Sequence, residues 1–371
     1  GYGALTGQDT ENDNLAIGYN ALGGAIAGGE YNVAIGNYSL DALTTGDYNV
    51  AVGYDALTAN TTGSRNTASG QESLKSNTEG DKNTASGYNS LYANTTGDEN
   101  TASGYYSLFA NTTGTRNIAM GYGALDAPDT ENDNLAIGYD ALGGAIDGGE
   151  KNVAIGNYSL DAATSGDNNT ATGYDALTGT TTGADNTALG YDAGDVLTTG
   201  SQNVIIGSGS DPSANSGANQ IVIGYGATGH GDNIAVIGNG SATAIHPHDD
   251  NEVDLGSSSY EYKDLYVDGV AYIDAIGMGS TAMTLPTADG TANYVLKTDG
   301  SGTLSWSSVS ATEVTITDNE STSENNALVF TSGGDVDGGS MGLESDGTAT
   351  YNPSTGVITA TGFSGAGTFS T

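Results

Sequence analysis

Two histidines separated by one residue, His246 and His248, form the pattern in this sequence that is best suited to hold a metal ion. Side chains at i and i+2 of an extended strand point to the same side. If that side faces a three-fold axis between three chains, six imidazoles surround the axis, which suits an octahedral transition metal such as iron. The alternative is a pair of solvated histidines in a linker beside Asp249 and Asp250.

Carboxylates crowd into two similar turns, one early in the chain and one further along. The residues are Asp9, Glu11 and Asp13 in the first turn and Asp129, Glu131 and Asp133 in the second. Carboxylate oxygens are the hard ligands that Ca²⁺ prefers, so each turn is a candidate calcium site. The spacing matches no EF-hand loop, and the alternative is that these acids are solvated turn residues.

No set of catalytic residues can be assembled from the sequence. The chain has no cysteine and only three histidines, and its carboxylates lie in turns rather than in a shared pocket pattern. We therefore predict a protein that is not an enzyme. The alternative is a glycosidase, which would need a pair of carboxylates in a cleft on the flank of the fold.

Composition limits the partners of the chain. It has 371 residues, of which only 36% are hydrophobic and 59 are glycine, and this favours an elongated, repetitive shape over a compact globule. The formal net charge of −38 disfavours binding to nucleic acid or to an anionic membrane surface. No apolar run reaches about 18 residues, so we expect no insertion into a membrane as a helix. The lack of cysteine fits an extracellular location.

A short repeat organises the first two thirds of the chain. The pattern Asn-x-Ala-x-Gly-x-x-(Ala/Ser)-Leu recurs every 17 residues, with two intervals of 18. A longer duplication lies over it, because the segment that begins at Asp9 returns almost unchanged 120 residues later. The copies begin at Asn14, Asn32, Asn49, Asn66, Asn83, Asn100, Asn117, Asn134, Asn152, Asn169, Asn186 and Asn203.

The repeat predicts a parallel β-solenoid. Residues alternate with a period of two in each copy, which indicates a strand, and a glycine turn precedes most copies. One unit cannot bury its own apolar face, but stacking coils about 4.8 Å apart hides that face and pairs the backbones in parallel. Thirteen or so coils would make a rod of roughly 60 Å.

Equivalent side chains of successive coils should then form rows along the rod, with Ala and Gly where the backbone packs closely. We expect the asparagines to form an amide ladder in which each side chain bonds to its copies above and below, and the leucines to form the core. A broken row of tyrosines follows the repeat glycine, and it suits either packing or sugar stacking. The variable strand positions are apolar in some coils and Thr or Ser in others, so we expect them to face neighbouring chains. The tyrosines are Tyr19, Tyr54, Tyr88, Tyr105, Tyr122, Tyr139, Tyr174 and Tyr191.

We predict three regions: a solenoid shaft over 1–245, a neck with short strands over 246–284 and a β-rich C-terminal region over 285–371. The last two hold few large aliphatic residues, and ordering them costs about 1 to 2 kcal/mol of backbone entropy per residue. Intertwining of three chains would supply the missing burial. The expected fold class is therefore all-β, in an obligate homotrimer.

The repeat resembles a known family. Asn32-Val33-Ala34-Ile35-Gly36 and its copy from Asn152 are similar to the head repeats of trimeric autotransporter adhesins. The resemblance covers roughly residues 1 to 240. It implies a left-handed parallel β-roll, three chains side by side, and attachment to surfaces.

The rest of the chain resembles bacteriophage tail fibres instead. The similar segments begin at Asp254, Tyr262, Leu285, Tyr294 and Tyr351. This resemblance implies a trimer that a C-terminal chaperone domain assembles before it is cut away, and His246 and His248 look like the metal-binding His-x-His of some trimeric fibres.

We therefore expect a structural, trimeric virion fibre that attaches to a host surface receptor or glycan and contacts other virion subunits. The alternative is a bacterial cell-surface adhesin or a self-assembling extracellular filament. Neighbouring tail genes would favour the first class, and a secretion signal upstream would favour the second. The sequence assigns no receptor-binding residues.

Overall fold

The computed structural model describes residues 1–6, 13–128 and 130–245. Beyond them it describes 255, 257, 259–268, 275–278, 281–284, 286, 292, 294–301, 303–308, 326–331, 343–352 and 357–360. All regular elements in these ranges are strands, and no helix occurs among them. The chain divides into two units, Gly1–Val253 and Asp254–Thr371.

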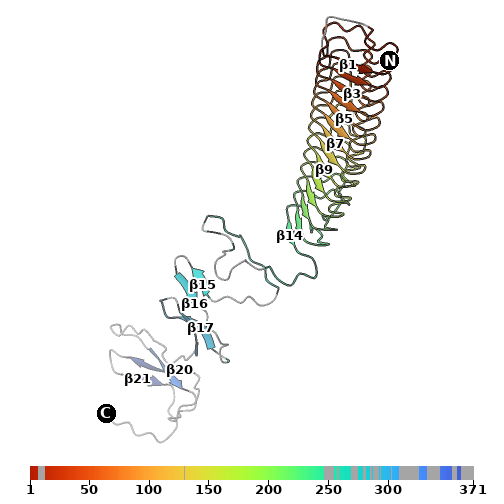
Figure 1. The fold of residues 1–371 in the computed structure, drawn as a ribbon. Helices are drawn as coiled ribbons and strands as arrows, with labels where there is room; N and C mark the ends of the chain where they lie inside the picture. The colour runs from red at the N-terminus through yellow and green to blue at the C-terminus, as the bar shows by residue number, and fades with distance from the viewer. Residues whose placement is uncertain are drawn as a thin grey trace. The chain divides into compact units, whose positions relative to one another are not determined.

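The first unit is a parallel β-solenoid, which confirms the fold predicted from the repeat (Figure 1). Its sheet has 14 strands in sequence order, and each strand pairs in parallel with the next. The strands are β1 Leu15–Ile17, β2 Val33–Ile35, β3 Val50–Val52, β4 Thr67–Ser69, β5 Thr84–Ser86, β6 Thr101–Ser103, β7 Ile118–Met120, β8 Leu135–Ile137, β9 Val153–Ile155, β10 Thr170–Thr172, β11 Thr187–Leu189, β12 Val204–Ile206, β13 Ile221–Ile223 and β14 Ala235–Ile237.

The repeat glycine after each strand turns the chain where coils stack most closely. Gly104 has φ +146, and a Cβ built on it would lie 2.1 Å from the carbonyl oxygen of Gly121 in the next coil. No other residue fits there, because a side chain would collide with backbone rather than with a flexible group. The requirement recurs in each regular coil, which explains the unbroken glycine row of the repeat.

The interior of the solenoid is narrow and is filled by small and branched side chains. The middle residue of the strands β2 to β11 is a fully buried alanine, and the predicted core position of the leucine row is confirmed. These leucines have φ near +50, a left-handed conformation that costs a branched residue roughly 1 to 2 kcal/mol. Burying the leucine side chain contributes about 1.5 to 3 kcal/mol, which offsets this cost. The row comprises Leu22, Leu40, Leu57, Leu74, Leu91, Leu108, Leu125, Leu142, Leu160 and Leu177.

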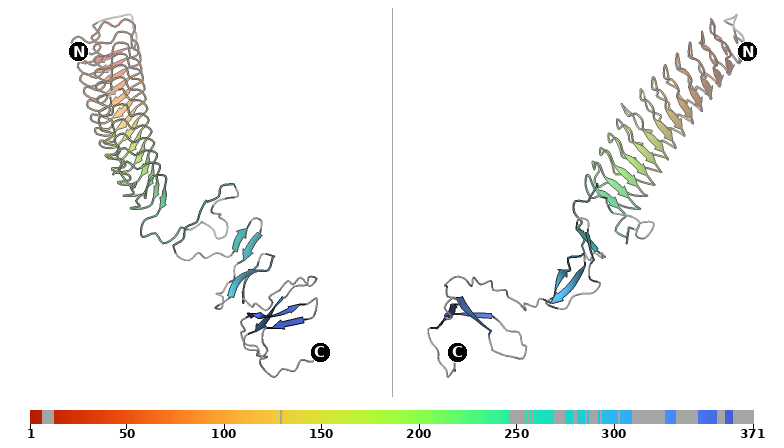
Figure 2. Two further views of the ribbon diagram at one scale, coloured as in Figure 1. Left: turned by 180° about the vertical axis from the view of Figure 1, so that it is seen from behind. Right: turned by 90° about the vertical axis from the view of Figure 1, so that its left-hand side faces the viewer.

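The second unit contains three small antiparallel sheets. Two are hairpins, and the third has three strands with an irregular register between Ala327 and Val329. In Figure 2 they are the short strands coloured from cyan to blue. Their bounds are β15 Ala275–Met278, β16 Thr281–Thr284, β17 Tyr294–Thr298, β18 Leu304–Ser308, β19 Asn326–Thr331, β20 Leu343–Asn352 and β21 Val357–Ala360.

Asp299 shapes the turn of the β17–β18 hairpin. Its carboxylate accepts hydrogen bonds from the backbone N–H groups of Ser301 (2.8 Å) and Thr303 (3.0 Å). These bonds lower the pKa of Asp299 to about 2. The predicted boundaries at 245/246 and 284/285, and the intertwining of chains, stay predictions.

Candidate functional site

The repeat asparagines hold each coil to the next. The Oδ1 of Asn32 accepts a hydrogen bond from the backbone N–H of Asn49 (2.8 Å), and the Nδ2 of Asn49 donates to the carbonyl of Gly63 in its own coil (2.8 Å). The same two bonds recur along the row, and from Asn32 to Asn203 these side chains are buried. The row is therefore part of the scaffold.

This geometry differs from the amide-to-amide ladder expected from the sequence. Direct bonds between neighbouring amides occur only in some coils, such as Asn186 Nδ2 to Asn169 Oδ1 (3.0 Å). The reason is that the backbone N–H of each asparagine lies before the strand and has no strand partner. The amide oxygen of the preceding coil satisfies this N–H group.

A second buried asparagine row runs through four successive coils, and sequence reasoning missed it. Asn77 donates to Asn60, Asn94 to Asn77 and Asn111 to Asn94, over 2.7 to 2.8 Å. The equivalent position holds Leu43 or Leu197 in two other coils. These leucines are the feature of the sequence that could have indicated a buried position. Three of the four lie in Asn-Thr-Thr sequons, yet all are fully buried, so the folded chain presents none of them for glycosylation.

The outer face of the long sheet carries no charged side chain from β1 to β14. We call it the strand face: it consists of the first and third residue of each of these strands. Many of its residues are large and apolar, and Ile17 and Leu189 are at least half exposed. Strands β4, β5 and β6 interrupt the apolar surface with Thr and Ser.

The tyrosines form a stacked row at the corner beside the strand face. Ring centroids of Tyr105 and Tyr122 lie 5.2 Å apart with nearly parallel planes, and Tyr122 stacks on Tyr139 at 5.0 Å. The row is more continuous than predicted, because Tyr38 and Tyr158 fill two interruptions from one position later in their coils. The stacked rings contact each other through their faces, whereas Tyr38 and Tyr158 meet their neighbours edge to face, so the row presents mainly edges and hydroxyls to solvent.

Charged side chains lie away from the strand face and pair between coils. Lys82 meets Glu99 at 2.7 Å and Arg116 meets Asp133 at 2.6 Å, both between exposed side chains, so each pair contributes little to stability. Lys75 contacts both Asp55 (3.1 Å) and Glu72 (2.9 Å). Burial alone would lower the pKa of Lys75, but the bonds to these carboxylates outweigh burial and raise it.

Burial and neighbouring carboxylates raise the pKa of several half-buried carboxyls. Burial raises the pKa of Asp126 to about 6, and the negative charge of Asp140 adds to the effect. Burial also raises the pKa of Asp211 to about 6, with a further contribution from Asp195. The pKa of Asp161 is also raised, again mainly by burial. These positions favour the protonated carboxyl and lose stability when they ionise.

In the second acidic turn, the described carboxylates bond to other groups of the same chain. Glu131 is buried, and its Oε1 accepts a hydrogen bond from the backbone N–H of Gly148 (3.0 Å), while Asp133 pairs with Arg116. In the part of the chain that the structure describes, no three Asp, Glu or His side chains gather as metal ligands. Asp9, Glu11, Asp129, His246 and His248 lie outside the described residues, and the iron and calcium sites stay predictions.

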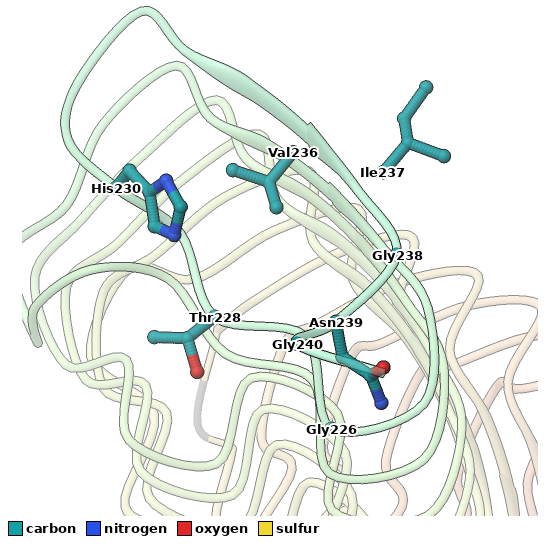
Figure 3. Close-up of a pocket in the computed structure, with 8 residues that line it drawn as sticks. All are labelled: Gly226, Thr228, His230, Val236, Ile237, Gly238, Asn239 and Gly240. Atoms are coloured by element: carbon teal, nitrogen blue, oxygen red, sulfur yellow. The ribbon is translucent and has the colours of Figure 1, made fainter. Parts of the chain in front are cut away.

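A hollow of about 400 Å³ opens at the last coil of the solenoid (Figure 3). Val236 of β14 and His230 turn toward it, whereas Ile237 points away. Thr228, Asn239 and three glycines complete the lining. It marks the end of the stacked interior, and it combines one imidazole with small polar groups.

A scan against protein-family models and a search of curated proteins both returned no match to this chain. Among the described residues, none belongs to a helix that is long and apolar enough to cross a membrane. The fold itself therefore defines the class: an all-β protein built on a parallel β-solenoid of about 17-residue coils.

Proposed function

We propose that this chain is a structural, non-enzymatic subunit of a trimeric extracellular fibre, and that the fibre is carried on a virion and attaches it to a host surface. In this proposal the coils wind left-handed, as in the adhesin heads that the repeat resembles. The solenoid is the rigid shaft, and the C-terminal strands belong to fibre domains that three chains build together.

The observation that carries the proposal is the strand face. In a chain with a net charge of −38, two copies repel each other wherever acidic surfaces meet. The strand face lacks charge along its whole length and exposes apolar side chains such as Ile17 and Leu189. A long exposed apolar surface of this kind marks a site of association.

The strand face is long and narrow. Fourteen strands about 4.8 Å apart give a face roughly 60 Å long and about 10 Å wide, or about 600 Å² per chain. A closed trimer buries about 1,800 Å² in all, or about 600 Å² at each of its three pairwise contacts, which is below the range of about 1,200 to 2,000 Å² of a standard interface, so no two chains would hold together through this face alone. Closing three copies around an axis covers all three faces, as a two-fold pair would cover two, and the trimeric families that the sequence resembles favour three copies.

Imaging of the native source with an antibody raised against the solenoid tests the biological setting. The proposal expects label on the fibres of virus particles, and purified chain should compete with the particles for host cells. Label confined to cell surfaces or to free filaments would replace the virion role with the adhesin or filament alternative.

A further inference from the structure

The tyrosine row has a gap close to its C-terminal end. Tyr191, Ser208 and Tyr225 occupy the same place in three successive coils. The backbone pairing shows this, since the N–H of Gly209 donates to the carbonyl of Tyr191 (2.8 Å) and the N–H of Gly226 donates to the carbonyl of Ser208 (2.9 Å). Ser208 stands where a ring would continue the stack. Two coil rises therefore leave roughly 10 Å between the two ring positions.

Both rings that border this gap are unusually exposed. Tyr191 stacks on Tyr174 on one side only and is 56% exposed, compared with 44% for Tyr105, which has a ring on either side. Tyr225 is 78% exposed, and no ring contact to it occurs among the described residues. One aromatic face of Tyr191 thus borders the gap, and the Tyr225 ring is free to turn a face toward it.

The coil between the two rings leaves the gap empty. Ser208 has a short side chain, and Gly209 follows it. A Cβ placed on Gly209 or on Gly226 would meet no atom within 4 Å, so open space surrounds this corner. With the Tyr225 ring turned toward Tyr191, the two rings would form the walls of a slot whose floor is backbone and the Ser208 side chain.

The width of the slot selects its occupant. A planar group between two rings needs about 7 to 8 Å, because carbon atoms in contact lie about 3.5 to 4.0 Å apart. Roughly 10 Å suits a thicker ring, such as a pyranose chair, whose C–H groups on both faces contact the electron-rich faces of tyrosine. We propose that this slot binds one neutral pyranose unit of a glycan between Tyr191 and Tyr225.

Nearby polar groups fit a sugar as well. The Ser208 hydroxyl lies on the floor, and the Asp192 carboxylate is close enough to Tyr191 to raise the pKa of its hydroxyl. Both groups accept hydrogen bonds from sugar hydroxyls. The strongly negative chain repels acidic sugars, which agrees with a neutral sugar as the ligand.

The other gap in the row provides an internal comparison. Gln71 replaces tyrosine between Tyr54 and Tyr88, but its coil carries two long side chains at the corner. Glu72, the second of them, bonds to Lys75 at 2.9 Å. These two side chains are longer than those of Ser208 and Gly209 in the C-terminal gap, so we expect this gap to leave less room and not to bind a sugar.

The slot deepens the proposed attachment role and rests on it only for the biological setting. All residues of the slot belong to the solenoid of one chain, so sugar binding can be tested on a single chain or on an assembly. Native mass measurement on the same samples reports the assembly separately, and a failed binding test would leave the trimer proposal standing.

Saturation-transfer NMR on the full chain, with methyl glycosides of glucose, galactose, mannose and N-acetylglucosamine, tests the proposal. We expect transfer to at least one of them with a Kd of about 1 to 10 mM, as suits a single sugar ring. Tyr191→Ala and Tyr225→Ala should each weaken binding at least about tenfold.

Ser208→Tyr is the sharpest variant, because most coils carry tyrosine at this place and the fold accepts it. It should complete the stack, abolish binding and leave the circular dichroism spectrum unchanged. Gln71→Tyr, the matched control, should bind like the original chain. No transfer to any glycoside, or unchanged binding by Ser208→Tyr, would overturn the proposal. So would binding of N-acetylarginine amide in place of every sugar, since that would make the slot a cation site.

Discussion

Replacing two equivalent asparagines tests how the solenoid satisfies its buried backbone. In Asn169→Ala, the N–H of Asn186 loses its acceptor (3.0 Å) and the carbonyl of Gly183 loses its donor (2.8 Å). In Asn100→Ala, the N–H of Asn117 is stranded in the same way, but the carbonyl of Gly114 keeps a second donor, Asn111 (3.1 Å). The two variants therefore differ by one unsatisfied group.

The expected magnitudes follow from that difference. A buried polar group without a partner costs about 1 to 3 kcal/mol. Asn100→Ala should lower the free energy of unfolding by about that amount, and Asn169→Ala by about 2 to 6 kcal/mol. Urea unfolding followed by circular dichroism measures both. Hydrogen exchange should show the amides of Asn117 and Asn186 losing protection in their respective variants. Equal losses, a larger loss for Asn100→Ala, or amides that stay protected would refute this account of the asparagine row.

Two further predictions concern the carboxyls and the glycine row. Because burial raises the pKa of Asp126 from 3.8 to about 6, its stabilising contribution is complete below pH 4 and is lost as the pH rises through about 6. The shift corresponds to roughly 3 kcal/mol, which solvent screening at this half-buried site reduces to about 1 kcal/mol. Asp126→Asn should therefore gain about 1 kcal/mol at pH 7 and nothing at pH 3.5 in thermal unfolding, and a gain that does not depend on pH would contradict the assignment. Gly104→Ala should cost about 3 kcal/mol or more, because its Cβ meets the Gly121 carbonyl, whereas Gly226→Ala, also at positive φ but in open space, should cost about 1 kcal/mol. Similar losses for the two glycine variants in urea unfolding would show that steric contact between coils is not the reason for the glycine row.

The regular part of the fold could be predicted from the sequence because a short period leaves few alternatives. The spacing of 17 residues, the alternation around each alanine and the leucine row together define the coil, and the structure confirms each of them. The second asparagine row could not be seen as easily. Residues such as Asn94 lie in Thr-rich turns, where a polar residue is normally exposed. Only the leucines at the equivalent positions, Leu43 and Leu197, indicate that this position faces the interior of the solenoid.

The candidate sites were less predictable, since they depend on departures from the repeat. Tyr158 continues the stack from a shifted position, and a list of repeat positions does not contain it. The slot at Ser208 is defined by what is missing from one coil.

Native mass measurement of the full chain tests the central claim most directly. The account predicts a species of three chains that persists on dilution, and Ile137→Glu in the strand face should dissociate it, because the substitution places three negative charges around one axis. A stably folded single chain, with the strand face exposed to water, would contradict the trimer.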